Sequence, residues 1–267
     1  MSAIRSGPTG VSRGFLLLTQ VRHEAQLKYI GSVAGLYWTI LNPIIQVGAY
    51  VFVVTVVFDA PLTATEGGRL DYAVFVLAGM STWLAMQDGL ISSAGSFVRH
   101  SEIVRNVVFP LELLQIAAVI VSLLSLAVSL TALVVIDIAG GRELVPSVLS
   151  FPLVLAVQLV FTIGVGLALA VMTTFVRDLL YLLPVLFQVL TLFTPIFYSI
   201  DALPGSLQTI ARLNPIYQLV DSYQRIFFEG TWPSWGGLAY AAIVSVALFV
   251  AGRAMFRALK GYAEALV

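Results

Sequence analysis

The stretch "FVRDLLYLLP" at residues 175–184 places one Arg and one Asp between two long apolar runs. Two charges at the centre of a bilayer would cost about 2.5 to 3.5 kcal/mol each, and the surrounding apolar segment is far longer than the about 20 residues that cross a bilayer core once. Arg177 and Asp178 therefore predict a tight turn between two membrane helices. Asp178 is placed to cap the second helix. The pair fits an interfacial salt bridge and a gating element equally well.

The composition of the whole chain indicates an integral membrane protein. Hydrophobic residues make up 59% of the chain and charged residues 10%, where a soluble domain has about a quarter charged residues. The 14 basic and 14 acidic residues balance, so the net charge gives no reason to expect a nucleic-acid partner. The chain has no Cys, and its two His, His23 and His100, are too few and too far apart to suggest a zinc site. No metal site is expected.

Six apolar segments are long enough to cross a membrane as helices, and they predict an all-α membrane protein with a transmembrane domain at residues 37–267. The predicted spans are residues 38–58, 73–92, 110–136, 148–176, 179–199 and 236–256. With a cytoplasmic N-terminus, ten basic residues flank the spans on the inside and four lie in the outer loops. This bias predicts that both termini are cytoplasmic.

The N-terminal region divides into two parts. Residues 1–13 are expected to form a flexible N-terminus. Residues 14–36 mix apolar and charged positions at helical spacing, so that Leu17 and Val21 share one face while Glu24 lies elsewhere. This pattern predicts an amphipathic helix on the cytoplasmic membrane surface, acting as an anchor or as a moving part.

Two loops are long enough to hold structure of their own. The cytoplasmic loop at residues 93–109 has room for one short helix that docks to another protein, and a plain solvated loop is the alternative. Its candidate docking residues are Phe97, Arg99, His100, Glu102 and Arg105. The outer loop at residues 200–235 repeats apolar residues at helical spacing on both sides of Asn214 and Pro215. It predicts two short amphipathic helices.

Several kinds of chemistry are missing from the sequence. No predicted span carries a charge near its middle, which makes an ion-coupled carrier unlikely as a class. The sequence has no G-x-x-x-x-G-K-[ST] motif, so the chain does not hydrolyse ATP by a P-loop. It also lacks a Ser/His/Asp set and a cluster of catalytic carboxylates, and no catalytic residue is predicted. If the protein moves a substrate uphill, a partner must supply the energy.

Five short motifs occur in a defined order along residues 22–256. They are Lys28 and Tyr29 with "SVAGLYW" and Asn42-Pro43, then "RNVVFPLEL", Arg177-Asp178, "TPIFYS" and Asn214-Pro215. In this order the chain resembles the permease subunit of type-2 ABC exporters, in the branch that exports lipid-linked polysaccharides. It departs from the family pattern at Ala34, where Leu is usual, and at His23 and Glu24, where Arg-Asp is common.

The resemblance implies a defined assembly. The family's permease is a homodimer of six-helix subunits, and each subunit binds a separate nucleotide-binding ATPase, giving two permeases plus two ATPases. ATP and Mg would be bound by that partner, and no cofactor is expected in this chain. The substrate would be a lipid-linked glycan such as O-antigen, teichoic acid, capsule or cell-wall galactan, exported across the bacterial inner membrane.

The resemblance also gives roles to residues of this chain. Residues 95–106 would be the coupling helix that contacts the ATPase, residues 14–30 the interface helix beside it, and the outer helices around Asn214 and Pro215 a gate. The first and fifth spans would line the channel, with aromatic side chains near its ends, although lipid-facing or packing roles are the alternative. The candidate channel residues are Tyr37, Trp38, Trp83, Phe193, Phe197 and Tyr198.

Three rival functions stay open at this point. The nearest is a type-2 exporter of small molecules, drugs or lipids. A membrane scaffold without transport belongs to another class, and failure to co-purify with any ATPase would favour it. An ion-coupled carrier is the third, and a flux driven by a pH gradient without an ATPase would favour that reading.

Overall fold

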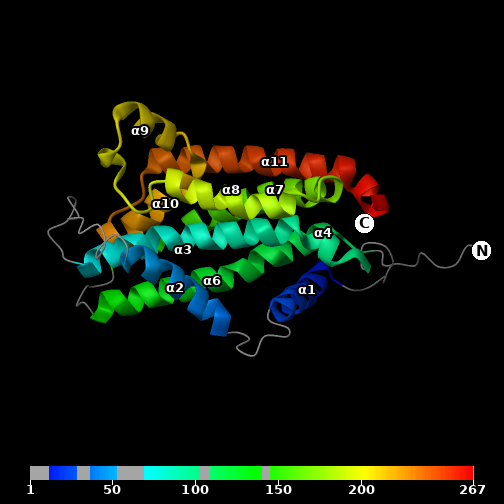
Figure 1. Ribbon diagram of the computed structural model, residues 1–267, viewed down its shortest axis with the longest axis horizontal. Coiled ribbons are helices and arrows are strands. Elements are labelled where there is room, and N and C mark those ends of the chain that lie inside the picture. Colours follow the sequence, from blue (N-terminus) through cyan, green and yellow to red (C-terminus); the bar gives the residue numbers. More distant parts are fainter. Residues whose placement is uncertain (1–11, 29–36, 53–68, 103–108, 140–144, 267) are drawn as a thin grey trace, which may run out of the picture.

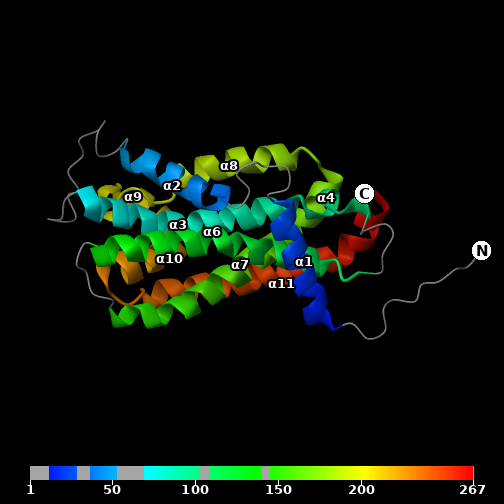
Figure 2. The same cartoon turned by 90° about the horizontal axis from the view of Figure 1, so that it is seen from below.

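The computed structural model describes residues 12–28, 37–52, 69–102, 109–139 and 145–266, and every regular element in these ranges is helical. Long helices run side by side along the molecule, as Figures 1 and 2 show from two directions. Helices α1 and α4 lie at one end of this bundle, whereas α9 and α10 lie at the other (Figure 1). The two ends therefore hold different sets of connecting segments.

The long helices form most of the bundle. They are α2 (Tyr37–Phe52), α3 (Arg69–Ala94), α6 (Glu112–Ala139), α7 (Phe151–Phe175), α8 (Leu179–Phe193) and α11 (Trp235–Leu266). The short elements are α1 (Arg13–Leu27), α4 (Ser96–Arg99), the 3-10 helices η2 (Pro146–Ser150) and η3 (Ile200–Ala202), α9 (Gly205–Arg212), α10 (Pro215–Gln224) and the π-turn η4 (Arg225–Glu229).

Four helical segments within the described ranges are long and apolar enough to cross a membrane. They are Val74–Ala94, Glu112–Val135, Pro146–Phe175 and Trp235–Ala263. They correspond to the second, third, fourth and sixth predicted spans. The first predicted span, residues 38–58, is described only as far as Phe52.

The turn predicted from "FVRDLLYLLP" is confirmed. Helix α7 ends at Phe175 and α8 begins at Leu179, and Val176 between them leaves the helical conformation with φ −127° and ψ 89°. The predicted cap is wrong, because Asp178 has helical backbone angles and its side chain makes no capping hydrogen bond. A capping side chain needs an extended backbone to reach back to the first free N–H groups.

Helix α8 ends at Phe193, six residues before the predicted end of the fifth span. Thr194 takes extended angles, φ −90° and ψ 128°, and precedes Pro195. The proline ring disfavours helical backbone at the residue before it, which explains the break. At 15 residues, α8 is roughly 22 Å long, shorter than the about 30 Å of a bilayer core.

The closest packing in the bundle joins α7 to α11. Gly164 of α7 lies so near α11 that a Cβ atom there would sit 2.5 Å from Phe249 Cα. A Cβ atom at Gly252 would overlap the carbonyl oxygen of Gly164 in the same way. The absence of side chains at these two positions lets the backbones approach, as is common between membrane helices.

A buried polar network ties α10 to the bundle. Gln158 of α7 lies at its centre, and its Oε1 accepts hydrogen bonds from Tyr223 Oη at 2.5 Å and from Thr82 Oγ1 at 3.1 Å. All three side chains are buried. The network spans three helices, so it fixes α10 relative to α3 and α7.

Replacing Gln158 with Leu is expected to lower the free energy of unfolding by about 1 to 3 kcal/mol, because the buried Tyr223 hydroxyl loses its acceptor. Adding Tyr223→Phe should recover part of that loss, so that the two changes are not additive. Thermal unfolding of the purified protein in detergent measures both effects. Gln188→Leu, at an exposed Gln on α8, is the control. Fully additive losses would show that the two side chains are not coupled.

Candidate coupling site

Helix α1 begins at Arg13 and is capped by Ser12, whose Oγ accepts a hydrogen bond from the backbone N–H of Phe15. It packs against α6, and the residues it buries are Gln20 and Glu24. The apolar side of α1 lies away from this contact, since Leu17 and Val21 are half-buried and Phe15 is 62% exposed. The position of this helix on the membrane surface stays a prediction. Gln20 and Glu24 face inward, where they lie against the polar side chains of Arg99 and His100.

A kink separates α3 from α4. Helix α3 ends at Ala94, whose carbonyl oxygen accepts a hydrogen bond from Thr173 Oγ1 of α7 at 2.5 Å. Gly95 follows, and a Cβ atom there would lie 2.5 Å from Arg99 Nη1. The Arg99 guanidinium folds back over this glycine and donates to the Ser92 carbonyl at 2.5 Å. Arg99 thus closes the kink.

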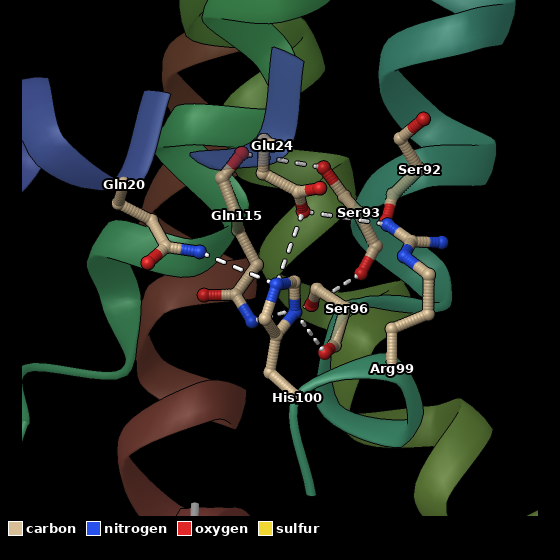
Figure 3. Close-up of polar contacts among 8 residues, drawn as sticks. All are labelled: Gln20, Glu24, Ser92, Ser93, Ser96, Arg99, His100 and Gln115. Carbon is tan, nitrogen blue, oxygen red and sulfur yellow. Dashed lines mark hydrogen bonds and ion pairs between the residues drawn. The ribbon is translucent and has the colours of Figure 1, made fainter. Parts of the chain in front are cut away.

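The side chains of the two helices meet in one cluster (Figure 3). Glu24 Oε1 lies 3.6 Å from Arg99 Nη2 and 4.0 Å from His100 Nε2. Gln20 Nε2 lies 3.3 Å from the same His100 nitrogen. His100 Nδ1 lies 3.0 Å from the Ser96 carbonyl oxygen, which can only accept, so Nδ1 carries a proton. In neutral His100, Nε2 then accepts from Gln20.

The Glu24 carboxylate is the most confined charge of the cluster. Its side chain is 8% exposed, whereas that of Arg99 is 41% exposed. Within the described part of the chain, Glu24 Oε1 makes no hydrogen bond, so the nearby Arg99 guanidinium provides its main charge compensation. Removing one partner from such a pair leaves an uncompensated charge. The Glu24–Arg99 ion pair therefore makes the positions of α1 and α4 interdependent.

A second ion pair joins the end of α1 to α3. Lys28 Nζ lies 2.5 Å from Asp88 Oδ2, and both side chains are about a third exposed or less. A small cavity of about 180 Å³ lies between the two pairs, with Glu24, Lys28, Ser92 and Arg99 among its walls. Helix α1 is held to the bundle by two charge contacts on one side.

The predicted docking residues divide into two groups. Phe97 is fully buried and packs against Phe256 of α11 at a ring distance of 5.7 Å, and His100 is 4% exposed. The prediction that these two form a docking surface is therefore wrong, because both are used to anchor α4. Arg99 and Glu102 are exposed. Arg105 lies outside the described residues.

The candidate channel residues are also separated by the structure. Trp83 is 1% exposed and its Nε1 donates to Thr191 Oγ1 of α8 at 2.6 Å, so its predicted place on a channel wall is wrong. Tyr37 and Trp38 are 75% and 48% exposed on α2, and Phe193 is 74% exposed on α8. These three positions are available to a ligand or a second subunit.

The candidate residues near α9 and α10 have structural roles in the fold. The predicted pair of short helices is confirmed as α9 and α10. Asn214 caps α10 by accepting from the backbone N–H of Ile216 at 3.0 Å, and Pro215 occupies the first turn. Phe197 is half-buried and its carbonyl accepts from Tyr72 Oη, while Tyr198 Oη donates to the Leu192 carbonyl.

Sequence reasoning missed the inward stripe of α1. Gln20, Glu24 and Lys28 follow one another at intervals of four, and each contacts α3 or the end of α4. That spacing puts them on one face of a helix, which was the signal available in the sequence. Their partners, including Asp88 and His100, are too far along the chain to be inferred from spacing.

Comparison with known proteins places this architecture in a family. The family model for the ABC-2 type transporter matches residues 17–228, which include most of α1, the α3–α4 junction, α9 and α10. The chain belongs to the ABC-2 type transporter family. This family comprises transmembrane permeases, so the chain is a multi-pass membrane protein.

Curated relatives of this ABC-2 permease align along most of their length. The O-antigen export system permease protein RfbA of Myxococcus xanthus is 28% identical over 243 residues, covering 90% of this chain and 91% of the relative. Two proteins of the same name from Klebsiella pneumoniae are 25% and 23% identical over 246 residues, each covering 92% of both chains. The similarity therefore extends over most of the chain.

Proposed function

We propose that this chain is the permease subunit of an ATP-driven exporter that moves a polyprenyl-linked polysaccharide across the bacterial inner membrane. The observation that carries the proposal is the similarity to permeases named for O-antigen export, which extends over at least 90% of either chain. Because these relatives are named for O-antigen export, O-antigen is the first candidate substrate. Teichoic acid, capsule and cell-wall galactan share its chemistry as lipid-linked polymers.

Energy for this export comes from a separate subunit in our proposal. The sequence lacks the phosphate-binding loop of ATPases, so a nucleotide-binding partner binds ATP and Mg. Two permeases and two ATPases form the working assembly. The ATPase contacts the cytoplasmic end of the bundle, where Arg99 and Glu102 are exposed beside α1.

The proposed membrane topology has six spans and cytoplasmic termini. Beyond the four long apolar helices, α2 and α8 supply the first and fifth spans. The ten basic residues on the inner flanks support this orientation. Helices α2 and α8 lie along the same edge of the bundle in Figure 2. Both carry large exposed apolar side chains, including Ile44, Ile45, Val185 and Leu192, which supports a channel or subunit contact there.

Coupling in this proposal runs through the α1–α4 cluster. ATP binding closes the ATPase dimer, and the closure moves the exposed part of the α4 segment. Because Glu24 pairs with Arg99, a displacement of α4 is transferred to α1. Phe97, packed on Phe256, transfers it to α11 as well. The outer helices α9 and α10 act as the gate at the other end.

Depletion of the protein in its own host tests the function. Polyprenyl-linked glycan on the cytoplasmic side of the inner membrane is quantified before and after depletion. Accumulation of a defined polymer is expected, and its analysis names the substrate. If no polymer accumulates while drug tolerance or lipid content changes, export of small molecules or lipids replaces the proposal. Failure of the protein to co-purify with an ATPase would instead favour a scaffold.

A further inference from the structure

A pocket lies at the end of the bundle opposite the coupling cluster. It has a volume of about 400 Å³ and is enclosed by the loop after α8, by α9 and α10, and by the start of α11. Its walls include Tyr198, Asp201, Arg212, Tyr217, Gln218 and Asp221. We call this space the outer pocket. Its size falls within the about 300 to 1,000 Å³ of small-molecule sites.

The charges of the outer pocket nearly cancel. Two guanidinium groups and three carboxylates line it, a formal excess of one negative charge. Arg225 is occupied by Asp221, with Nε 2.8 Å from Oδ2, and by Glu229 at 3.8 Å. Arg212 and Asp201 have no ion-pair partner among the described side chains. A highly charged anion is disfavoured here, whereas a neutral ligand with many hydroxyls can use both groups.

Aromatic and amide groups add to this wall. Tyr217 is 6% exposed and donates to Asp221 Oδ1 at 3.4 Å. Burial, with the neighbouring Asp221 carboxylate, raises the pKa of Tyr217, so the phenol keeps its proton over the physiological range. The Gln218 side chain donates to the Arg212 carbonyl at 2.6 Å, which ties α10 to the end of α9. Phenol rings offer flat apolar faces, and the amide and carboxylate oxygens accept hydrogen bonds from hydroxyls.

Hydrogen bonds fix the segments that form the outer pocket to the rest of the bundle. Gln224 Nε2 donates to the Ile196 carbonyl at 3.1 Å, and Tyr72 Oη donates to the Phe197 carbonyl at 3.2 Å. These bonds fix the loop after α8 to α10 and to α3. Gly237 at the start of α11 leaves room for the Gln218 amide, because a Cβ atom there would overlap it. Such preorganisation lowers the entropy that a ligand must overcome.

We propose that the outer pocket binds a sugar unit of the exported glycan as the polymer emerges between α9, α10 and the end of α8. The proposal rests on the glycan-export function above and names a binding site for its substrate. Asp201 and Gln218 accept hydrogen bonds from sugar hydroxyls, and Arg212 donates to ring or hydroxyl oxygens. The ring of Tyr198 faces the apolar C–H surface of the sugar, and the buried Tyr217 holds Asp221 in the wall.

A thiol-protection experiment on the assembled permease–ATPase complex tests the site. The natural chain has no Cys, so Ser199→Cys in the pocket wall introduces one thiol into this subunit. The probe is the repeat-unit oligosaccharide released by mild acid from the glycan that accumulates on depletion. Maleimide labelling at this position is expected to slow several-fold when the oligosaccharide is saturating. Ser206→Cys on α9, outside the pocket wall, should label at an unchanged rate.

A second variant tests whether Asp201 and Arg212 bind the oligosaccharide. Asp201→Asn with Arg212→Gln, added to Ser199→Cys, removes both unpaired charges and leaves polar side chains at these two exposed positions. Loss of two charge-assisted hydrogen bonds should raise the oligosaccharide concentration for half-protection by about tenfold or more. Equal protection of both cysteines, or no protection at Ser199→Cys, would show that the outer pocket does not bind the sugar. Either result would leave the proposed export function unaffected. Absence of any accumulated glycan on depletion overturns the export function, and the pocket proposal with it.

Discussion

Replacing Arg99 with Glu is expected to reduce ATP-coupled export by at least about tenfold. The new carboxylate would face Glu24, and two like charges about 4 Å apart repel by roughly 4 kcal/mol at the effective dielectric near a protein surface. Since Arg99 is 41% exposed, solvent screening reduces this to roughly 2 kcal/mol. An energy of that size shifts the docking equilibrium of α1 on α4 by more than about tenfold.

The charge swap separates this contact from a general effect of the mutation. Glu24→Arg combined with Arg99→Glu restores opposite charges across the same two helices, so it should recover a large part of the lost export. Arg22→Glu, at an exposed position on α1, is the control and should leave export near wild type. Export and ATP hydrolysis are measured together in proteoliposomes. A swap variant as inactive as Arg99→Glu would show that the ion pair does not carry the coupling.

Replacing Gly252 with Leu should separate α7 from α11 and cause the largest loss of stability. Even a Cβ atom at this position overlaps the carbonyl oxygen of Gly164, which is backbone and cannot rotate away. Overpacking of a tight contact typically costs about 1 to 3 kcal/mol, and a whole Leu side chain in a backbone contact lies at or above the upper end of that range. Gly252→Ala should give a smaller loss in the same direction.

Thermal unfolding of the purified protein in detergent measures this series. Gly261→Leu in the same helix is the matched control, because a side chain at that position meets no atom within 4 Å. It should unfold near the wild-type temperature. Gly164→Ala, on the other side of the contact, should be destabilised as well, since its Cβ would lie 2.5 Å from Phe249 Cα. Equal unfolding temperatures for Gly252→Leu and Gly261→Leu would contradict the close backbone contact.

The two ends of the bundle have different proposed roles. At one end, ion pairs connect α1 to α3 and α4, so a movement imposed on α4 reaches the bundle. At the other end, the outer pocket is held by hydrogen bonds between α10, α3 and the loop after α8. Helix α3 reaches both ends and packs against α6, α7 and α10. It therefore provides a rigid physical connection between the coupling site and the outer pocket.

The sequence by itself determined the features that depend on local composition. Apolar runs predicted the long helices, the Arg177-Asp178 pair predicted the turn at residues 175–179, and helical spacing predicted α9 and α10. Each of these follows from residues near one another in the chain, because hydropathy and helical periodicity act over one or two turns. The family resemblance rests on the same kind of ordered local motif.

Only the tertiary structure decided which side chains are used for packing. Trp83 and Phe97 were predicted at functional surfaces, yet each is buried by a helix distant in sequence, α8 for Trp83 and α11 for Phe97. Gln20 lies against His100, 80 residues away, and this contact turns the polar side of α1 toward the bundle. Burial depends on which helix faces another across the bundle. The spacing of residues along one helix does not identify the helix against which it packs.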